Sequence, residues 1–476
     1  MKPLRPRLLL LVACLSYVCC VVAQKREVHI LAVNDMHATI DVFPQLAALI
    51  DSLRTADPSL LVFSAGDNRT GNPLNDKYEI PAYPMVALMN QCGFNGSALG
   101  NHEFDVHSLA RLVGLSNFRY ICANMTADDS VGIRTVPYQV FDVEGLKVGV
   151  VGAIQVGHQG IPSSHPDNLH GLHFTPPGEA IADYEWLSRQ CDATIILSHI
   201  GYEADIEVAK QNPWIDLIIG GHTHTQLTGK ERVNGVLITQ NKNKFGRVTY
   251  ITLTVDSGRV VDKRAEYIDI KHYPKTNPLV ASMVEHFSSN PLFRQVVGHA
   301  AAPFEVREEL GCMMCDAYIE AFDADLAVEN PGGVRIDCLP AGDITLLNVL
   351  EMDPFDNNAV VLELTGEELL RMMLTYCSNR LIGFPYVGGM RCELTLNPAN
   401  PKLIKSVRMF TPDGKKLNMK RKYRVVTNSY VPATSSIPEG SAHEQNVQTT
   451  DVIVRYLGNH PSVNYQGVRR LFVKQK

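Results

Sequence analysis

Five short apolar segments in the first half of the chain are each followed within a few residues by aspartate, asparagine or histidine. The segments cover residues 28–33, 60–63, 96–99, 194–197 and 217–219. Their continuous hydrophobicity is typical of strands buried on both faces of a sheet that helices cover. In such folds functional groups collect outside the carboxyl ends of the strands. Seven polar residues are therefore expected to converge at one edge: Asp35, His37, Asp67, Asn101, His199, His222 and His224.

The hexapeptide GNHEFD, Gly100 to Asp105, is the most polar of these turns. The side-chain oxygen of Asn101 can bind a hard cation, and His102 can donate a proton or stabilise a developing negative charge. Asp105 follows His102 by three residues and can orient the imidazole. Taken alone, the hexapeptide would also suit a polar loop with a helix cap.

Together the seven residues indicate a metal centre. Mixed oxygen and imidazole ligands favour Zn, Mn, Fe or Co over Ca or Mg. One shared carboxylate can hold two cations roughly 3.5–4 Å apart, as two-metal hydrolases require. We assign Asp67 as this bridge, with Asp35, His37 and His224 on one cation and Asn101, His199 and His222 on the other. A single-cation site is the alternative, although one cation needs fewer ligands.

The amino terminus predicts an exported protein. Residues 1–23 combine Lys2, Arg5 and Arg7 with an apolar stretch and small residues before Gln24, as in a cleaved signal peptide. A membrane anchor is less consistent with so short a stretch, and Cys19 or Cys20 would permit a lipidated form. We expect a periplasmic, cell-surface or secreted location.

The net charge of the chain limits the binding partners that we expect. Removal of residues 1–23 would take the net charge from −6 to −9, which argues against binding a nucleic-acid polymer. A small anionic substrate remains compatible, because metals and a few arginines create a local positive pocket. Eight cysteines lie beyond residue 23, so disulfides are plausible, but their pairing and the oligomeric state cannot be deduced from sequence.

The length of 476 residues predicts about two or three domains. Strands and helices alternate in residues 24–275, and an alternating pattern over 248–270 predicts a closing strand. Residues 276–295 are interpreted as a linker helix. Residues 296–476 begin with a predicted helix at 310–322 and then become richer in strands, which indicates a second domain.

The metal-ligand turns carry a family resemblance. The blocks Asp35-Met36-His37, Gly66-Asp67, Gly100-Asn101-His102-Glu103, His199 and Gly221-His222-Thr223-His224 resemble the calcineurin-like metallophosphoesterase signature. The longer GNHEFD form and the two-domain layout are similar to the 5′-nucleotidase family, which includes bacterial UDP-sugar hydrolases and ecto-5′-nucleotidases. This resemblance implies an α/β fold, α+β overall, with a four-layer αββα catalytic domain and a smaller α+β substrate-binding domain. It also implies that His102 stabilises the transition state or protonates the leaving group, with Asp105 as its partner.

The resemblance extends to substrate recognition in the second domain. Asn330, Gly333 and Arg335 match a loop that binds phosphate, and Phe355 and Tyr430 match two rings that clasp the base. Arg307 lies near the position of another family arginine. The Gly-Gly-Asp that normally follows the second ring is replaced by the segment Ala433 to Pro438.

The resemblance therefore implies hydrolysis of nucleoside 5′-monophosphates with two divalent cations. The alternatives are a UDP-sugar hydrolase, a 2′,3′-cyclic-nucleotide phosphodiesterase, or a non-catalytic nucleotide-binding surface protein.

Overall fold

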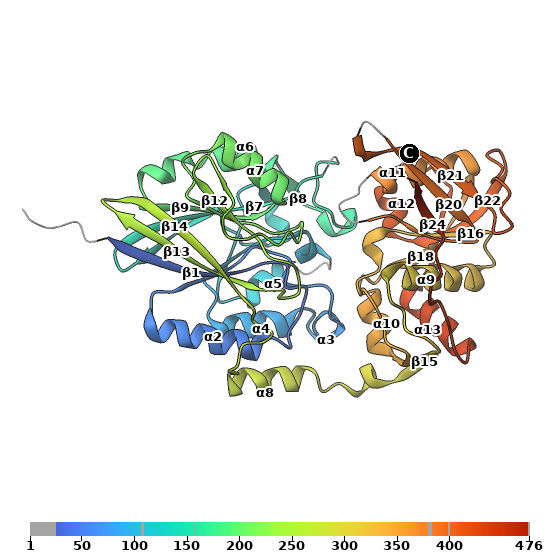
Figure 1. Ribbon diagram of the computed structural model, residues 1–476, viewed down its shortest axis with the longest axis horizontal. Coiled ribbons are helices and arrows are strands. Elements are labelled where there is room, and N and C mark those ends of the chain that lie inside the picture. Colours follow the sequence, from blue (N-terminus) through green and yellow to red (C-terminus); the bar gives the residue numbers. More distant parts are fainter. Residues whose placement is uncertain (1–24, 106–108, 158, 379–382, 398–399, 475–476) are drawn as a thin grey trace, which may run out of the picture.

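The computed structural model describes residues 25–474, except 106–108, 158, 379–382 and 398–399. The predicted signal peptide, residues 1–23, lies outside this range. Figure 1 shows two bodies side by side along the long axis, linked through α8 (Pro278–Phe287). Among the described helices, none is both long enough and apolar enough to cross a bilayer.

The first body is built on two six-stranded sheets. In one sheet the order is β14-β13-β1-β2-β3-β4, and in the other it is β11-β12-β10-β9-β7-β6. The strands of the first sheet are β1 (Arg26–Val33), β2 (Leu61–Ser64), β3 (Gly96–Ala98), β4 (Arg119–Ile121), β13 (Val248–Asp256) and β14 (Arg259–Ile268). Those of the second are β6 (Tyr138–Val143), β7 (Leu146–Ile154), β9 (Ala193–His199), β10 (Leu217–Ile219), β11 (Arg232–Val233) and β12 (Val236–Thr239).

Alternation along the strands produces a four-layer structure. Along β1, Ile30 belongs to the core between the two sheets, and its neighbour Leu31 belongs to the core under the helices. The first sheet is covered by α2 (Phe43–Ala56), α4 (Tyr83–Cys92), α5 (Leu109–Leu115) and α8. The second is covered by α6 (Pro177–Ala182) and α7 (Tyr202–Gln211). The predicted αββα architecture is confirmed.

Two predicted elements differ in detail. The single strand expected over 248–270 is a hairpin, because the turn at Ser257 and Gly258 has positive φ and reverses the chain between β13 and β14. The helix expected in the linker, α8, buries Val280 and Phe287 in the same apolar core as α2 and α4. A pair of short strands, β5 (Met125–Ala127) and β8 (Leu172–Phe174), and the helix α3 (Pro73–Asp76) complete this body.

The second body centres on the sheet β19-β16-β22-β18-β23. Its strands are β16 (Leu326–Glu329), β18 (Asn358–Thr365), β19 (Tyr386–Gly388), β22 (Lys422–Asn428) and β23 (Ala442–Gln448). One face packs on α9 (Arg307–Phe322), α10 (Leu346–Met352) and α13 (Thr449–Asn459). The other face packs on α11 (Gly366–Ser378) and on β20 (Arg391–Asn397) and β21 (Asn400–Phe410), which form a small sheet with β24 (Leu471–Lys474). The pair β15 (Val296–Ala300) and β17 (Gly342–Thr345) and the short helix α12 (Tyr430–Thr434) complete it.

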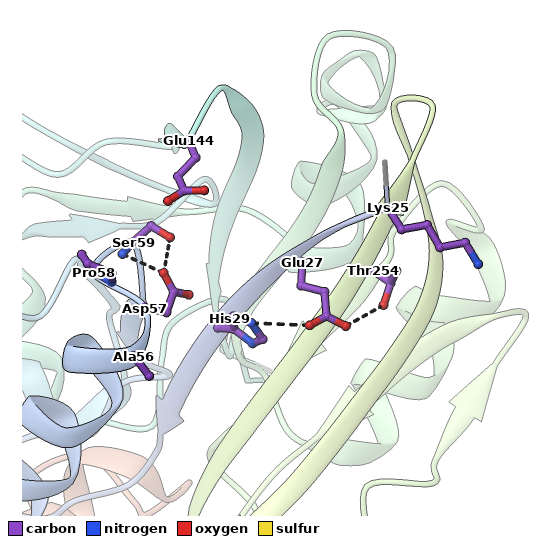
Figure 2. A pocket seen from close by; sticks show the side chains of 9 residues that line it. All are labelled: Lys25, Glu27, His29, Ala56, Asp57, Pro58, Ser59, Glu144 and Thr254. Atoms are coloured by element: carbon purple, nitrogen blue, oxygen red, sulfur yellow. Dashed lines mark hydrogen bonds and ion pairs between the residues drawn. The ribbon is translucent and has the colours of Figure 1, made fainter. Parts of the chain in front are cut away.

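The carboxyl ends of the parallel strands in the first body face the second body. Lys77, just after α3, forms an ion pair with Asp356, and the Nζ of Lys244 donates to the carbonyl of Arg335 over 3.3 Å. At the opposite end of β1 an open hollow is lined by polar side chains that include Glu27, His29 and Asp57 (Figure 2). The eight cysteines within the described residues are free thiols, so the structure contains no disulfide among them.

Candidate metal and catalytic site

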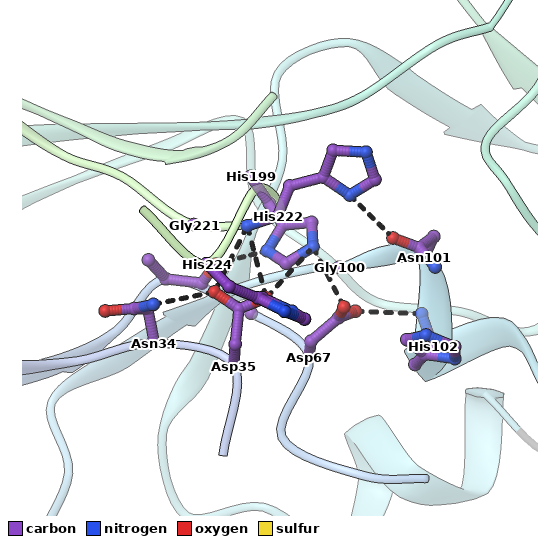
Figure 3. Close-up of polar contacts among 12 residues, drawn as sticks. Asn34, Asp35, Asp67, Gly100, Asn101, His102, His199, Gly221, His222 and His224 are labelled. Carbon is purple, nitrogen blue, oxygen red and sulfur yellow. Dashed lines mark hydrogen bonds and ion pairs between the residues drawn. The ribbon is translucent and has the colours of Figure 1, made fainter. Parts of the chain in front are cut away.

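Five of the seven expected ligands meet where β1, β2, β9 and β10 end, and Figure 3 shows Asp35, Asp67, His199 and His224 among them. His224 Nε2 lies 3.3 Å from Asp35 Oδ1 and 3.1 Å from His37 Nε2. His199 Nε2 lies 3.2 Å from Asp67 Oδ2, and His37 Nε2 lies 4.0 Å from the same oxygen. Asp67 therefore touches both sets of ligands, which is the position required of a bridging carboxylate.

The other two expected ligands, Asn101 and His222, pair with each other at the edge of this cluster. His222 Nδ1 lies 3.0 Å from Asn101 Oδ1. The amide nitrogen of Asn101 donates to the Ser163 carbonyl over 3.2 Å, which turns its oxygen toward His222. The backbone N–H of His222 donates to both carboxylate oxygens of Asp35. Burial and the nearby His199 lower the pKa of His222 to about 4, so this ring is neutral and able to bind a metal.

The imidazoles present free nitrogens to the cluster because their other nitrogens are held. His199 Nδ1 lies 2.6 Å from the Ala65 carbonyl, and His37 Nδ1 lies 3.0 Å from the Thr70 carbonyl. A carbonyl only accepts, so each Nδ1 donates to it, and Nε2 is the nitrogen that faces the cluster and would bind a cation in place of a proton. His199 Nε2 is buried and has no hydrogen bond to any residue that the structure describes. An orphaned nitrogen beside two buried carboxylates fits a cation.

The two carboxylates remain ionised despite their burial. Burial favours the neutral form of Asp67, but His199, His102 and His37 outweigh it and hold the pKa of Asp67 well below its usual value. For His199, burial lowers the pKa, yet Asp67 and Asp35 raise it to about 10. The cluster is thus strongly attractive to positive charge, which a divalent cation would supply in place of protons.

A buried glutamate that the sequence analysis gave no role organises the loop of Asp67. The Glu103 carboxylate accepts from the backbone N–H groups of Asp67 at 3.0 Å, Asn68 at 2.8 Å and Gly100 at 2.6 Å. Its place inside the GNHEFD turn was visible in the sequence. Its function was not, because all three donors belong to the backbone, which carries no sequence signature.

His102 and Asp105 form the expected pair, with 2.5 Å between His102 Nδ1 and Asp105 Oδ2. Burial lowers the pKa of His102, but the charges of Asp105 and Asp67 outweigh it and leave the pKa above its usual value. The backbone N–H of His102 donates to Asp67 Oδ1 over 2.9 Å. The ring of His102 lies 5.1 Å from that of His37, so a proton donor stands directly beside the metal ligands.

Two predicted substrate residues of the second body reach this site. Arg335 Nη2 lies 3.3 Å from His37 Nδ1, and its guanidinium lies 5.7 Å from the centre of the Phe355 ring. Phe355 stacks on His102 with 6.0 Å between ring centres. Tyr430 is half-buried at the start of α12, and burial together with the charges of Tyr376 and Asp105 raises its pKa. Contacts from the second body thus fall on the metal cluster and on the His102–Asp105 pair.

The remaining predicted residues have other surroundings. Arg307 forms an ion pair with Asp337, and its side chain is 37% exposed. The amide nitrogen of Asn330 donates to Glu329 Oε1 over 3.0 Å, and its oxygen accepts from the Gly333 N–H over 3.1 Å. A side chain at Gly333 would collide with Glu329, since a Cβ there would lie 1.8 Å from Glu329 Oε1. Glycine is thus required at 333 by an internal contact.

Known protein families match the sequence of each body. The calcineurin-like phosphoesterase profile matches residues 28–226, and the 5′-nucleotidase C-terminal domain profile matches residues 296–435. The trifunctional nucleotide phosphoesterase protein YfkN of Bacillus subtilis is 25% identical over 94% of this chain, which spans only 35% of its length. The 5′-nucleotidase of Vibrio cholerae is 27% identical over 87% of this chain and 85% of its own. The crystal structure of a 5′-nucleotidase precursor from Thermus thermophilus has the same fold, with a TM-score of 0.84 at 23% identity over 94% of this chain and 99% of that one.

Proposed function

Since this chain belongs to the 5′-nucleotidase family and is a hydrolase of the metallophosphoesterase type, we propose that it cleaves nucleoside 5′-monophosphates to nucleoside and phosphate. One observation carries the proposal. Arg335 of the second body lies against the metal-cluster residue His37, and Phe355 lies against His102. A phosphate at the cluster would therefore meet a guanidinium, and a group attached to that phosphate would meet an aromatic ring.

We further propose that the cluster holds two divalent cations, with zinc, manganese, cobalt and iron as candidates. Asp35, His37 and His224 would hold one cation, Asn101, His199 and His222 the other, and Asp67 both. Bound there, the cations would supply Lewis-acid chemistry, namely activation of water near neutral pH and neutralisation of phosphate charge.

The chain's own residues would support the same displacement. Asp105 fixes the proton of His102 on Nδ1, so Nε2 faces away from the carboxylate and toward substrate. With its pKa raised, His102 can stay protonated, stabilise charge on the phosphoryl oxygens, or pass a proton to the departing ribose oxygen. The fork of Arg335 suits two phosphate oxygens at once.

Base recognition would use Phe355 and Tyr430 as stacking surfaces. The absent Gly-Gly-Asp weakens the expectation for ribose and base contacts more than that for hydrolysis. For this reason a UDP-sugar or a 2′,3′-cyclic nucleotide is the natural competitor substrate.

A substrate panel tests the proposal. The mature protein, supplied with Mn or Zn, is assayed on AMP, UDP-glucose, 2′,3′-cyclic AMP and p-nitrophenyl phosphate, with a chelator control. The highest kcat/KM is expected for AMP. Preference for either competitor would reassign the substrate, and failure to cleave any of the four would favour a non-catalytic nucleotide-binding protein.

A pair of variants separates base stacking from phosphate chemistry. Tyr430→Ala should raise KM for AMP by about tenfold, whereas Tyr430→Phe, which keeps the ring, should not. An equal loss on AMP and on p-nitrophenyl phosphate would remove the stacking role. Export is also proposed, from residues 1–23 alone, and amino-terminal sequencing of the mature chain tests it.

A further inference from the structure

Glu329 is a buried acid at the end of β16, one residue before the loop that carries Asn330 and Arg335. Its side chain is 1% exposed. One carboxylate oxygen, Oε1, accepts from the Asn428 amide over 2.6 Å, and the other, Oε2, accepts from the Tyr318 hydroxyl over 3.0 Å. Asn428 ends β22, the strand that pairs with β16, so Glu329 ties two neighbouring strand ends together.

The orientation of Asn428 is set by this contact. Its amide nitrogen donates to Glu329 Oε1, and the amide nitrogen of Asn330 donates to the same oxygen over 3.0 Å. The side-chain oxygen of Asn428 is then free to accept from the backbone N–H of Val431 over 3.1 Å, inside the helix α12 that begins with Tyr430. A rotated Asn428 amide would place N–H against N–H, so the helix start depends on the acceptor that Glu329 provides.

A third segment is joined to the first two. Ser429 Oγ donates to Asn357 Oδ1 over 3.1 Å, and the Arg335 N–H donates to the Met352 carbonyl over 2.9 Å. The segment between Met352 and Asn357 carries Phe355. Arg335, Phe355 and Tyr430 therefore sit on three loops that are linked by hydrogen bonds, and Glu329 is the buried acceptor at the base of the link between two of them.

We propose that Glu329 is a positioning residue for substrate binding, which holds the Arg335 loop and the Tyr430 helix in register through Asn428 and Asn330. The role rests on the proposed function, in which Arg335 and Tyr430 contact the nucleotide. Glu329 itself touches neither the metal ligands nor His102 among the contacts of the described residues. Its influence on catalysis should consequently appear in KM more than in kcat.

The chain offers both a conservative variant and a matched control. Glu329→Gln keeps an oxygen for Asn428, and its amide nitrogen can donate to the Tyr318 hydroxyl, so it should preserve the geometry. Neutrality at this site is compatible with its surroundings, because burial and the nearby Asp353 raise the pKa of Glu329 to about 8. Glu309, also in the second body and 3% exposed, accepts from the N–H groups of Glu305 and Gly467, at the start of α9. Glu309→Ala thus removes a comparable buried acceptor with no link to the three loops.

Steady-state kinetics on AMP with the full-length mature protein give the first readout. Glu329→Ala should raise KM about tenfold with kcat within about twofold and metal content unchanged, and Glu329→Gln should return KM to the wild-type value. Glu309→Ala should leave KM unchanged. Equal KM values for Glu329→Ala and wild type, or an equal rise in Glu309→Ala, would overturn the proposal.

Hydrogen exchange gives a readout that needs no substrate. Peptides covering residues 329–336 and 428–436 should exchange faster in Glu329→Ala, but not in Glu329→Gln or Glu309→Ala. If wild-type protein cleaves no nucleotide, the proposed function fails, and exchange alone then decides the positioning role. If Glu329→Ala does not fold, Tyr318→Phe removes only the hydroxyl donor and should still raise KM or exchange in the same peptides, by a smaller factor of about two to three. No change in that variant would contradict the proposal.

Discussion

Five of the seven expected metal ligands have a left-handed backbone. The φ angles are 49° at Asp35, 46° at His37, 51° at Asp67, 75° at His222 and 52° at His224. This conformation is unfavourable for residues with a side chain, and it survives only where surrounding structure enforces it. Here the N–H groups of Asp35 and His37 donate to the carbonyls of Gly66 and Asp67 at 3.0 Å each, so the two loops hold each other.

Glycine at 100 is required by the same close approach. A Cβ there would lie 2.1 Å from Asp67 Oδ1 and 2.4 Å from the Asp67 nitrogen. We expect Gly100→Ala to displace Asp67 and lower both metal content and activity by at least about tenfold. Gly114→Ala, in α5 with open space around the added methyl, is the control and should behave like wild type. Elemental analysis with an activity assay measures both, and full metal content in Gly100→Ala would refute the argument.

His102 is expected to act on the chemical step. His102→Ala should lower kcat by about 10²–10⁴-fold, the usual range for loss of a positioned proton donor, with metal content unchanged. A loss of metal in this variant would instead identify His102 as a ligand. Asp105→Asn should lower kcat less than His102→Ala does. The imidazole of His102 remains, but it loses the carboxylate that orients it and favours its protonated form.

At the scale of elements, the strands of the first body place the loops that follow them next to one another. Neighbouring loops are held by buried acids that accept backbone N–H groups. Glu103 accepts three such groups around Asp67, and the Asp76 carboxylate of α3 accepts those of Thr70, Gly71 and Asn72. The Thr70 carbonyl in turn faces His37. A helix after β2 therefore fixes the tautomer of a histidine after β1.

Glu329, at the end of β16, should make the free energy of unfolding depend on pH. Burial and the charge of Asp353 raise the pKa of Glu329 to about 8, compared with 4.5 as its ordinary value. Between these two pH values the folded chain keeps a proton that the unfolded chain has released, so stability falls as pH rises from about 4.5 to about 8. The loss should be on the order of a few kcal/mol.

Glu329→Gln should remove this contribution. The variant should equal wild type in free energy of unfolding near pH 4.5 and exceed it at pH 8. Denaturant unfolding at the two pH values measures the difference. A constant gap between the two proteins at both values would contradict a raised pKa.

At the scale of the whole molecule, polar contacts join the two bodies beside the metal cluster. Lys77 pairs with Asp356, the residue after Phe355, and Lys244 donates to the Arg335 carbonyl. Each of these contacts flanks a residue of the second body that touches the cluster. They are partly exposed, so each should contribute no more than about 1 kcal/mol, and salt should weaken the ion pair.

Lys77→Met should therefore raise KM for AMP by about two- to threefold at low salt, with kcat little changed. At high salt the difference from wild type should shrink, since screening has already weakened the pair in wild type. Lys210→Met is the control, because Lys210 pairs with Glu207 within α7. A salt-independent rise in KM would mean that Lys77 acts through packing rather than charge.

The residue pattern alone predicted the alternation of strands and helices in the first half, a second part richer in strands, and polar residues gathered at strand ends. Those features depend on local quantities that a sequence records directly: runs of apolar residues, the spacing of helical faces, and polar residues after strands. The pairing of His102 with Asp105 is also local, because three residues separate them. The αββα layering was implied by the resemblance to a known family.

The contacts between segments far apart in the sequence were decided by the tertiary structure alone. The hairpin of β13 and β14 and the packing of α8 on α2 depend on partners far along the chain. The same holds for the surface ion pair of Arg307 and for the need for glycine at 333, where Glu329 occupies the space. Glu103, Asp76 and Glu329 act on backbone N–H groups or on an amide brought near by folding. Any residue type except proline can supply a backbone N–H, so the sequence does not indicate which residues donate to these acids, and only the folded chain shows it.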